Sequence, residues 1–227
     1  MANETEFERL WRSSLEVQGE YPGAVFIGGL AVAAHIYGLP GREALAGETH
    51  DADLMLARAD ATELTEREAL AVNRRLDKRE FVRGDFAFDV YVQGEHRLAV
   101  PYEDAYASSE VSTRGLRVAS WEHLLLLKSD AAAARHGVAP GKKDREDIVR
   151  LLAVGAAQGG LQAPPSPYWT PERLAVVRDA LVPGTVALAD GNDHVAARLR
   201  RDVAPLAQAL ADALASGKGN APSAPGF

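Results

Sequence analysis

The sequence predicts an α+β fold, in which helices flank a mixed β-sheet and a helical region follows. Three observations indicate this fold. An apolar strand at 24–27 runs into a glycine pair and a helix, the strand at 51–57 carries aspartates at alternate positions, and the chain after residue 119 is mostly helical in pattern. Hydrophobic residues make up 47% of the 227 positions, which is enough for a substantial core.

The composition excludes several classes of protein. There is no cysteine, so disulfides and thiolate sites are impossible. The formal net charge of −7 argues against a protein that coats nucleic acid nonspecifically. The N-terminal stretch is acidic, unlike a signal peptide, and the longest apolar runs are too short to cross a bilayer. We therefore expect a cytoplasmic protein with no membrane contact.

The first elements are predicted as a helix at 4–17, the strand at 24–27 and a helix from about Leu30 to Tyr37. A loop at 38–48 follows, with three glycines and a proline. Arg42 lies in this loop. It is a candidate phosphate ligand, and the alternative is an ordinary surface arginine.

Asp51 and Asp53 stand two residues apart in a predicted strand and therefore project from one face. Ala52 and Leu54 face the opposite side. Two neighbouring carboxylates repel each other unless a cation lies between them. Mg²⁺ or Mn²⁺ suits such oxygen ligands. The alternative is a pair of solvated aspartates at a strand edge.

Gly28 and Gly29 end the first buried strand and begin the following helix. Glycine allows the backbone to approach a ligand closely, and free N–H groups at a helix start bind anions. The triphosphate of an NTP suits this position.

A hairpin is predicted from strands at 80–83 and 86–92, with a turn at Gly84-Asp85. Asp89 shares a face of the second strand with Tyr91. A carboxylate among aromatic residues on a central strand is costly unless it is paired or bound to metal. Asp89 is therefore the candidate third carboxylate. Asp85 is the alternative, although its place beside Gly84 is typical of a turn residue.

Other elements complete the prediction. A capping box at 65–68 predicts a helix to about residue 76, and short strands are expected at 96–100 and 111–118. The C-terminal region has helices from Ser120 to Gly137, after residue 143, and from Thr170 to Pro183, then a last apolar stripe. We expect a catalytic domain at 1–118, a helical region packed on it at 119–215 and a disordered tail at 216–227.

The glycine pair and the Asp51-x-Asp53 motif resemble those of the DNA polymerase β-like nucleotidyltransferase superfamily. Within it, the chain is most similar to AbiEii-like toxin nucleotidyltransferases of abortive-infection and toxin–antitoxin systems. That group has a later helical lysine, a basic residue and a K/R-D-x-x-D helix start. The matching residues are Lys128, Arg135 and the segment from Lys143 through Asp144 to Asp147.

The resemblance implies a nucleotidyltransferase-type sheet and transfer of NMP from an NTP to an acceptor hydroxyl. It implies that Asp51, Asp53 and Asp89 hold Mg²⁺, that Lys128 contacts phosphate and that Asp144 orients Lys128 or the base. The acceptor is tRNA, another RNA or a protein, and an antitoxin is the expected partner. Two alternatives are a transferase for a small molecule of antibiotic type and a non-enzymatic nucleotidyltransferase-fold binding protein.

Overall fold

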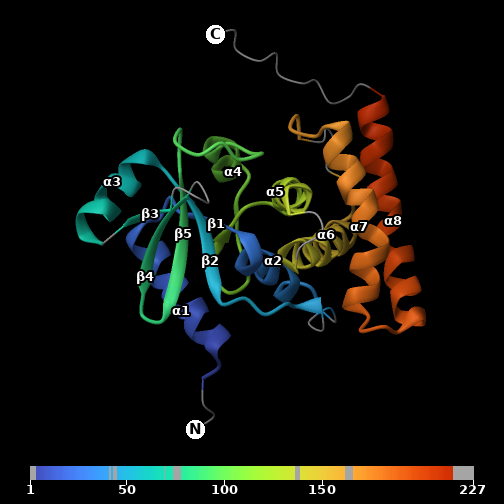
Figure 1. The fold of residues 1–227 in the computed structure, drawn as a ribbon, viewed down its shortest axis with the longest axis horizontal. Coiled ribbons are helices and arrows are strands. Elements are labelled where there is room, and N and C mark those ends of the chain that lie inside the picture. Colours follow the sequence, from blue (N-terminus) through green and yellow to red (C-terminus); the bar gives the residue numbers. More distant parts are fainter. Residues whose placement is uncertain are drawn as a thin grey trace. The chain divides into compact units, whose positions relative to one another are not determined.

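The computed structural model describes residues 4–40, 42, 45–68, 70–73, 78–135, 139–161 and 166–216. The chain divides into two compact units, Met1–Ser120 and Trp121–Phe227 (Figure 1). The division falls two residues after the boundary predicted at residue 118. The first unit contains a sheet with helices, and the second is helical. Of the predicted tail at 216–227, all residues after Ser216 lie outside the described residues.

The first unit is built on a mixed seven-stranded sheet in the order β3-β4-β5-β2-β1-β7-β6. β2 runs parallel to β5, and β1 runs parallel to β7, while the other neighbours are antiparallel. The α+β prediction, with helices flanking a mixed sheet and a helical C-terminal part, is confirmed. The elements are α1 (Glu6–Glu20), β1 (Val25–Ile27), α2 (Gly28–Tyr37), β2 (Asp51–Leu56), α3 (Arg58–Arg67), β3 (Ala71–Asn73), β4 (Lys78–Arg83), β5 (Phe86–Val92), α4 (Tyr102–Ala107), β6 (Glu110–Val111) and β7 (Arg117–Val118).

One face of this sheet is apolar and forms the core of the first unit. In the pairing register, Ala52 of β2 lies opposite Phe88 of β5, which lies opposite Phe81 of β4. All three are buried, and the two phenylalanine rings stack with their centroids 5.0 Å apart. Because side chains alternate along a strand, the aspartates of β2 and β5 project from the other face.

Arg83 of β4 lies on the same face as Phe81. Its ion pairs connect helices α1 and α3 to this apolar side of the sheet. The Arg83 guanidinium is 2.9 Å from the Glu20 carboxylate at the end of α1. It is also 2.6 Å from the Glu68 carboxylate just after α3. The opposite face of the sheet carries the aspartates, and α2 begins on that side, where Gly28 lies beside Asp53.

Two predictions in the first unit are wrong. The Thr65 motif does not start a helix, because α3 already begins at Arg58 and the Thr65 hydroxyl donates to the Ala61 carbonyl, 2.7 Å away, within it. The chain then forms the edge strand β3 by pairing with β4. No strand forms at 96–100 either, because the backbone turns at the end of β5 and the His96 amide donates to the Val92 carbonyl, 3.2 Å away.

The second unit consists of four helices in its described part, which are listed below. The predicted stop before Pro183 is wrong, since α7 continues through it. The next residue, Gly184, is where α7 approaches α6 closely: a Cβ on Gly184 would lie 2.6 Å from the Arg145 carbonyl oxygen. The bounds are α5 (Trp121–Ala134), α6 (Ala139–Ala157), α7 (Pro171–Leu188) and α8 (Asp193–Ala215).

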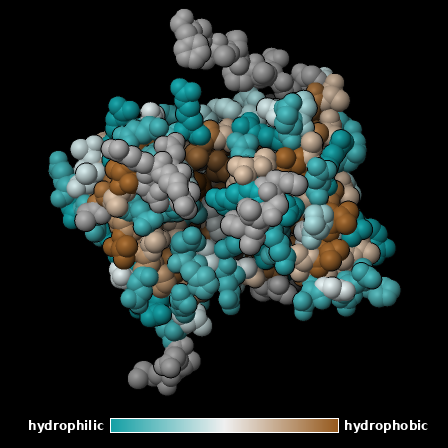
Figure 2. Space-filling model, in the orientation of Figure 1, coloured by the Kyte–Doolittle hydropathy of each residue, from teal (hydrophilic) through white to brown (hydrophobic). Residues whose placement is uncertain are grey.

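The visible surface is mainly hydrophilic, with hydrophobic residues in small separate patches (Figure 2). Among the described residues, no helix combines the length and the apolar character that crossing a bilayer requires.

Candidate functional site

Three carboxylates lie in one row across the sheet of the first unit. Asp53 of β2 lies opposite Asp89 of the parallel strand β5, and Asp89 lies opposite Glu80 of β4. Neighbouring strands are about 4.8 Å apart, so these side chains stand next to each other. Asp51 lies two residues before Asp53 and projects from the same side. We call Asp51, Asp53, Asp89 and Glu80 the carboxylate face.

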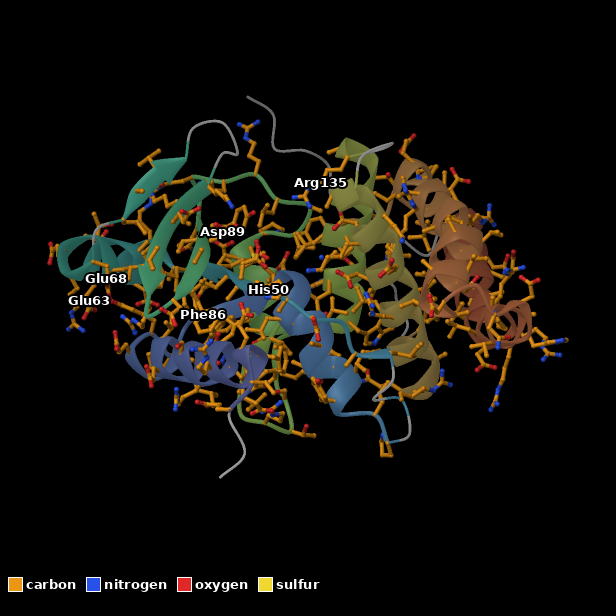
Figure 3. All side chains as sticks on the ribbon, turned by 60° about the horizontal axis from the view of Figure 1, so that its bottom comes forward. His50, Glu63, Glu68, Phe86, Asp89 and Arg135 are labelled. Carbon is orange, nitrogen blue, oxygen red and sulfur yellow. The ribbon has the colours of Figure 1, made fainter. Side chains whose placement is uncertain are left out.

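Asp89 is the most buried member of the carboxylate face, with 9% of its side chain exposed. It lies on the central strand β5 (Figure 3) and forms an ion pair with Lys78 of β4. Burial raises the pKa of Asp89, the Lys78 ammonium opposes this rise, and the charges of Asp51 and Glu80 add to it. The face is therefore a region of concentrated negative charge, which Lys78 partly neutralises.

Asp51 lies at the exposed end of the face, where β2 begins. The Thr49 hydroxyl donates to the Asp51 carboxylate over 2.9 Å. Thr49 itself is buried. The loop before β2 thus orients one carboxylate while leaving it open to solvent and to a ligand.

Gly28 brings the start of α2 against Asp53. Its φ is +69°, in the left-handed region that favours glycine, and a Cβ there would lie 2.0 Å from the Asp53 carboxylate oxygen. The N-terminus of a helix carries a partial positive charge and favours an adjacent anion. Gly29 follows in the first turn of α2. The helix start therefore faces a carboxylate, on the side of the sheet predicted for the triphosphate.

Gly28→Ala is expected to destabilise the protein more than Gly84→Ala. Gly84 has a similar φ of +60°, but a Cβ there meets nothing within 4 Å. Both variants incur the strain of the left-handed region, about 1–2 kcal/mol. Only Gly28→Ala also forces Asp53 aside, which adds roughly 1–3 kcal/mol. Urea unfolding of both variants measures the difference. Equal losses would mean that Asp53 moves away from the helix start without cost.

The other predicted residues of the first unit lie apart from this row. Asp85 is in the β4–β5 turn, with 78% of its side chain exposed and Arg9 3.4 Å away. Of the two alternatives for the third carboxylate, Asp89 is therefore the one beside Asp53. Arg42 is half-buried in the segment between α2 and β2, where its backbone takes part in turn hydrogen bonds.

A pocket of about 450 Å³ lies beside the start of β2. The start of α1, Tyr37 of α2 and the segment before β2 form its walls. Its lining includes Thr49, the residue that holds Asp51, and the carboxylates of Glu6, Glu8 and Glu48. Thr49 thus links the pocket to Asp51 at the exposed end of the carboxylate face. Its lining residues are Thr5, Glu6, Phe7, Glu8, Tyr37, Ala46, Gly47, Glu48, Thr49 and His50.

The predicted residues of the second unit form a buried charge network of their own. The Lys128 ammonium of α5 lies 2.7 Å from the Asp147 carboxylate and 3.5 Å from that of Asp144, both on α6. Arg135, at the end of α5 (Figure 3), lies 3.3 Å from Asp144. Arg150 lies 2.8 Å from Asp147. Four residues of the predicted second motif are therefore paired with one another: Lys128, Arg135, Asp144 and Asp147.

Asp144 and Asp147 were expected at the start of a helix after residue 143. Instead α6 begins at Ala139, so both lie inside the helix, three residues apart and therefore on one side of it. Their carboxylates are buried and held by cations from α5 and α6 rather than by the helix dipole. All of these paired residues belong to the second unit.

No protein-family model matches the chain, and no curated protein shows detectable similarity to it.

The donors of the carboxylate face suit a hard divalent cation, since they are carboxylate oxygens on a face with excess negative charge. In the described part of the chain, no three His, Asp or Glu side chains converge as a preformed metal cage. Mg²⁺ does not need such a cage, because it keeps several waters and binds through one or two carboxylates plus substrate phosphates. Asp51 and Asp53 fit that requirement, with Asp89 adjacent and held by Lys78.

Lys78 and Glu80 were not among the predicted site residues. The predicted strand begins at residue 80, so Lys78 falls outside it, and the pairing of Glu80 depends on the register of the hairpin. A two-residue hairpin loop fixes the register of its strands. Counting back from the Gly84-Asp85 turn places Glu80 opposite Asp89, as observed. The signal was therefore present in the sequence.

Proposed function

We propose that this protein is a metal-dependent nucleotidyltransferase, which transfers NMP from an NTP to an acceptor hydroxyl. One observation carries the proposal: Asp53 and Asp89 are direct neighbours on adjacent parallel strands, with Asp51 on the same face. The start of α2, at Gly28, lies against Asp53. This combination supports the resemblance to AbiEii-like nucleotidyltransferases drawn from the sequence.

The reaction follows from the chemistry of the triphosphate. The acceptor oxygen attacks the α-phosphorus, the bond from that phosphorus to the bridging oxygen breaks, and pyrophosphate leaves. A Mg²⁺ ion held by Asp51 and Asp53 would neutralise the charge that develops on the phosphate oxygens. Asp89 is a candidate to accept the hydroxyl proton, because its raised pKa brings it closer to the range of a useful base. Gly28 and Gly29 offer backbone N–H groups to the β- and γ-phosphates.

The acceptor class suggested by the resemblance is RNA, including tRNA, or protein. A transferase of this kind is expected to be toxic when expressed alone and to have an antitoxin partner. In this proposal Lys128 contacts phosphate and Asp144 orients Lys128 or the base, as the resemblance implies. Because both residues are already paired within the second unit, substrate binding has to compete with those ion pairs.

A small hydroxylated acceptor is the second candidate, and the pocket beside β2 favours it. Its volume of about 450 Å³ lies within the usual size range of small-molecule sites. The carboxylates and aromatic rings of its lining suit a molecule that carries protonated amines. Thr49 lines the pocket and its hydroxyl donates to the Asp51 carboxylate, so this residue links the pocket to the carboxylate face.

A labelling experiment tests both candidates. Purified protein with Mg²⁺ and each α-labelled NTP is incubated with total RNA, with cell protein and with a panel of aminoglycosides and lincosamides. The control is the Asp51→Ala/Asp53→Ala variant. We expect the wild type alone to transfer label, and the labelled fraction identifies the acceptor class. Absence of label in every fraction, together with absence of NTP binding, would contradict the proposal and favour a non-enzymatic binding protein.

A further inference from the structure

Lys78 supplies a cation to the carboxylate face. Its ammonium pairs with Asp89, and both side chains are largely buried, with 13% and 9% exposed. Lys78 comes from β4, two residues before Glu80, so it projects from the same face as the row of carboxylates. One lysine therefore projects from the same face as the four acidic side chains and is paired with the most buried of them.

A buried carboxylate is stable only with a counter-charge, and removing one partner of a buried ion pair is strongly destabilising. The negative charges of Asp51 and Glu80 also repel the Asp89 carboxylate. A divalent cation bound at Asp51 and Asp53 would lie within one strand spacing of Asp89 and supply the same compensation. Lys78 and the metal then compete to neutralise the Asp89 carboxylate, because two cations at one carboxylate repel each other.

We propose that Lys78 is an internal counter-ion of the carboxylate face, which stabilises the metal-free protein and is displaced from Asp89 when a divalent cation binds. This inference rests on the proposed function, since it assumes the metal site at Asp51 and Asp53. Lys78 is thus a positioning residue. It holds the Asp89 carboxylate in place beside Asp53 until the cation arrives, and it lowers the affinity of this face for the metal.

The test is thermal unfolding of the wild type and Lys78→Met in EDTA and in Mg²⁺ at matched ionic strength. In EDTA, Lys78→Met is expected to lower Tm by about 5 °C or more. Mg²⁺ should raise the Tm of the variant more than that of the wild type, because the metal restores the missing charge. Mn²⁺ titration followed by electron paramagnetic resonance should show an affinity at least about tenfold higher in Lys78→Met, because the competing charge is gone.

Two further variants separate charge from packing. Lys78→Arg keeps the cation and should behave like the wild type in EDTA. Lys78→Met/Asp89→Asn removes both charges and should lose less stability in EDTA than Lys78→Met alone. If Lys78→Met does not fold without metal, the double variant and Lys78→Arg still carry the comparison.

The outcomes for the inference and for the function differ. Equal Mg²⁺ responses in the wild type and Lys78→Met would overturn the counter-ion role while leaving the metal site intact. Absence of any Mg²⁺ or Mn²⁺ response in every variant would overturn both the metal site and the inference. A metal response of the expected pattern without any nucleotidyl transfer would support the role of Lys78 and contradict the proposed enzyme activity.

Discussion

Asp53→Asn is expected to reduce nucleotidyl transfer by at least about a hundredfold, the usual effect of removing one preorganised electrostatic group from an active site. Asp53 lies opposite Asp89 in the sheet and against the start of α2, so it adjoins both parts of the proposed reaction centre. Asparagine has nearly the same shape and preserves the packing against Gly28. The lost negative charge weakens metal binding and therefore phosphate binding. Transfer of label from an α-labelled NTP measures the effect.

Asp85→Asn is the matched control for this prediction. It makes the same chemical change in the first unit, at an exposed side chain of the β4–β5 turn that lies outside the carboxylate row. Its transfer rate should equal that of the wild type. Circular dichroism establishes that both variants are folded. A folded Asp53→Asn protein with unchanged activity would rule out metal-assisted transfer at this face.

Lys128→Met is expected to lower the free energy of unfolding by about 3–5 kcal/mol, the usual cost of removing one partner from a buried ion pair. Lys128 lies against two carboxylates that are each only 3% exposed. One oxygen of Asp147 has no hydrogen bond among the described residues, so the charge of Lys128 is its main compensation. Arg135 and Arg150 remain and limit the loss. Urea unfolding measures it.

Arg67→Met is the control, because Arg67 pairs with Glu63 on the exposed side of α3. Removing an exposed pair of this kind should cost less than about 1 kcal/mol. The comparison also separates two roles of Lys128. Loss of stability of the expected size assigns it a structural role in the second unit. A variant with wild-type stability and no nucleotidyl transfer would instead assign it the phosphate contact that the family resemblance implies.

The sequence was informative where alternation and local turn chemistry decide structure. The apolar positions of the strands at 51–57 and 86–92 predicted which side of the sheet is core, and the buried Phe81–Phe88 stack bears this out. The two-residue Gly84-Asp85 turn was predicted correctly, since glycine at positive φ suits a tight hairpin loop. These features depend on residues close together in the chain.

The errors arose where contacts distant in the sequence override local preference. The Thr65 motif has the pattern of a helix start, yet the segment after α3 becomes an edge strand because β4 offers it a hydrogen-bonding partner. Helix α7 continues through Pro183 at the point where Gly184 packs against α6. The resemblance implied that Asp144 orients Lys128 or the base, but the shorter ion pair of Lys128 with Asp147 was not predicted, because it depends on how two helices meet.

The ion pair between β4 and β5 bears on how the chain folds. β4 and β5 are joined by a two-residue turn, whereas β2 pairs with β5 across about thirty residues. Loop-closure entropy favours the local hairpin, so Lys78 is expected to neutralise Asp89 before β2 brings Asp53 alongside. The hairpin then presents β2 with a partner whose charge is already compensated, and the order of assembly avoids placing two bare carboxylates together. Pulse-labelled hydrogen exchange that finds β2 protected before the hairpin would contradict this order.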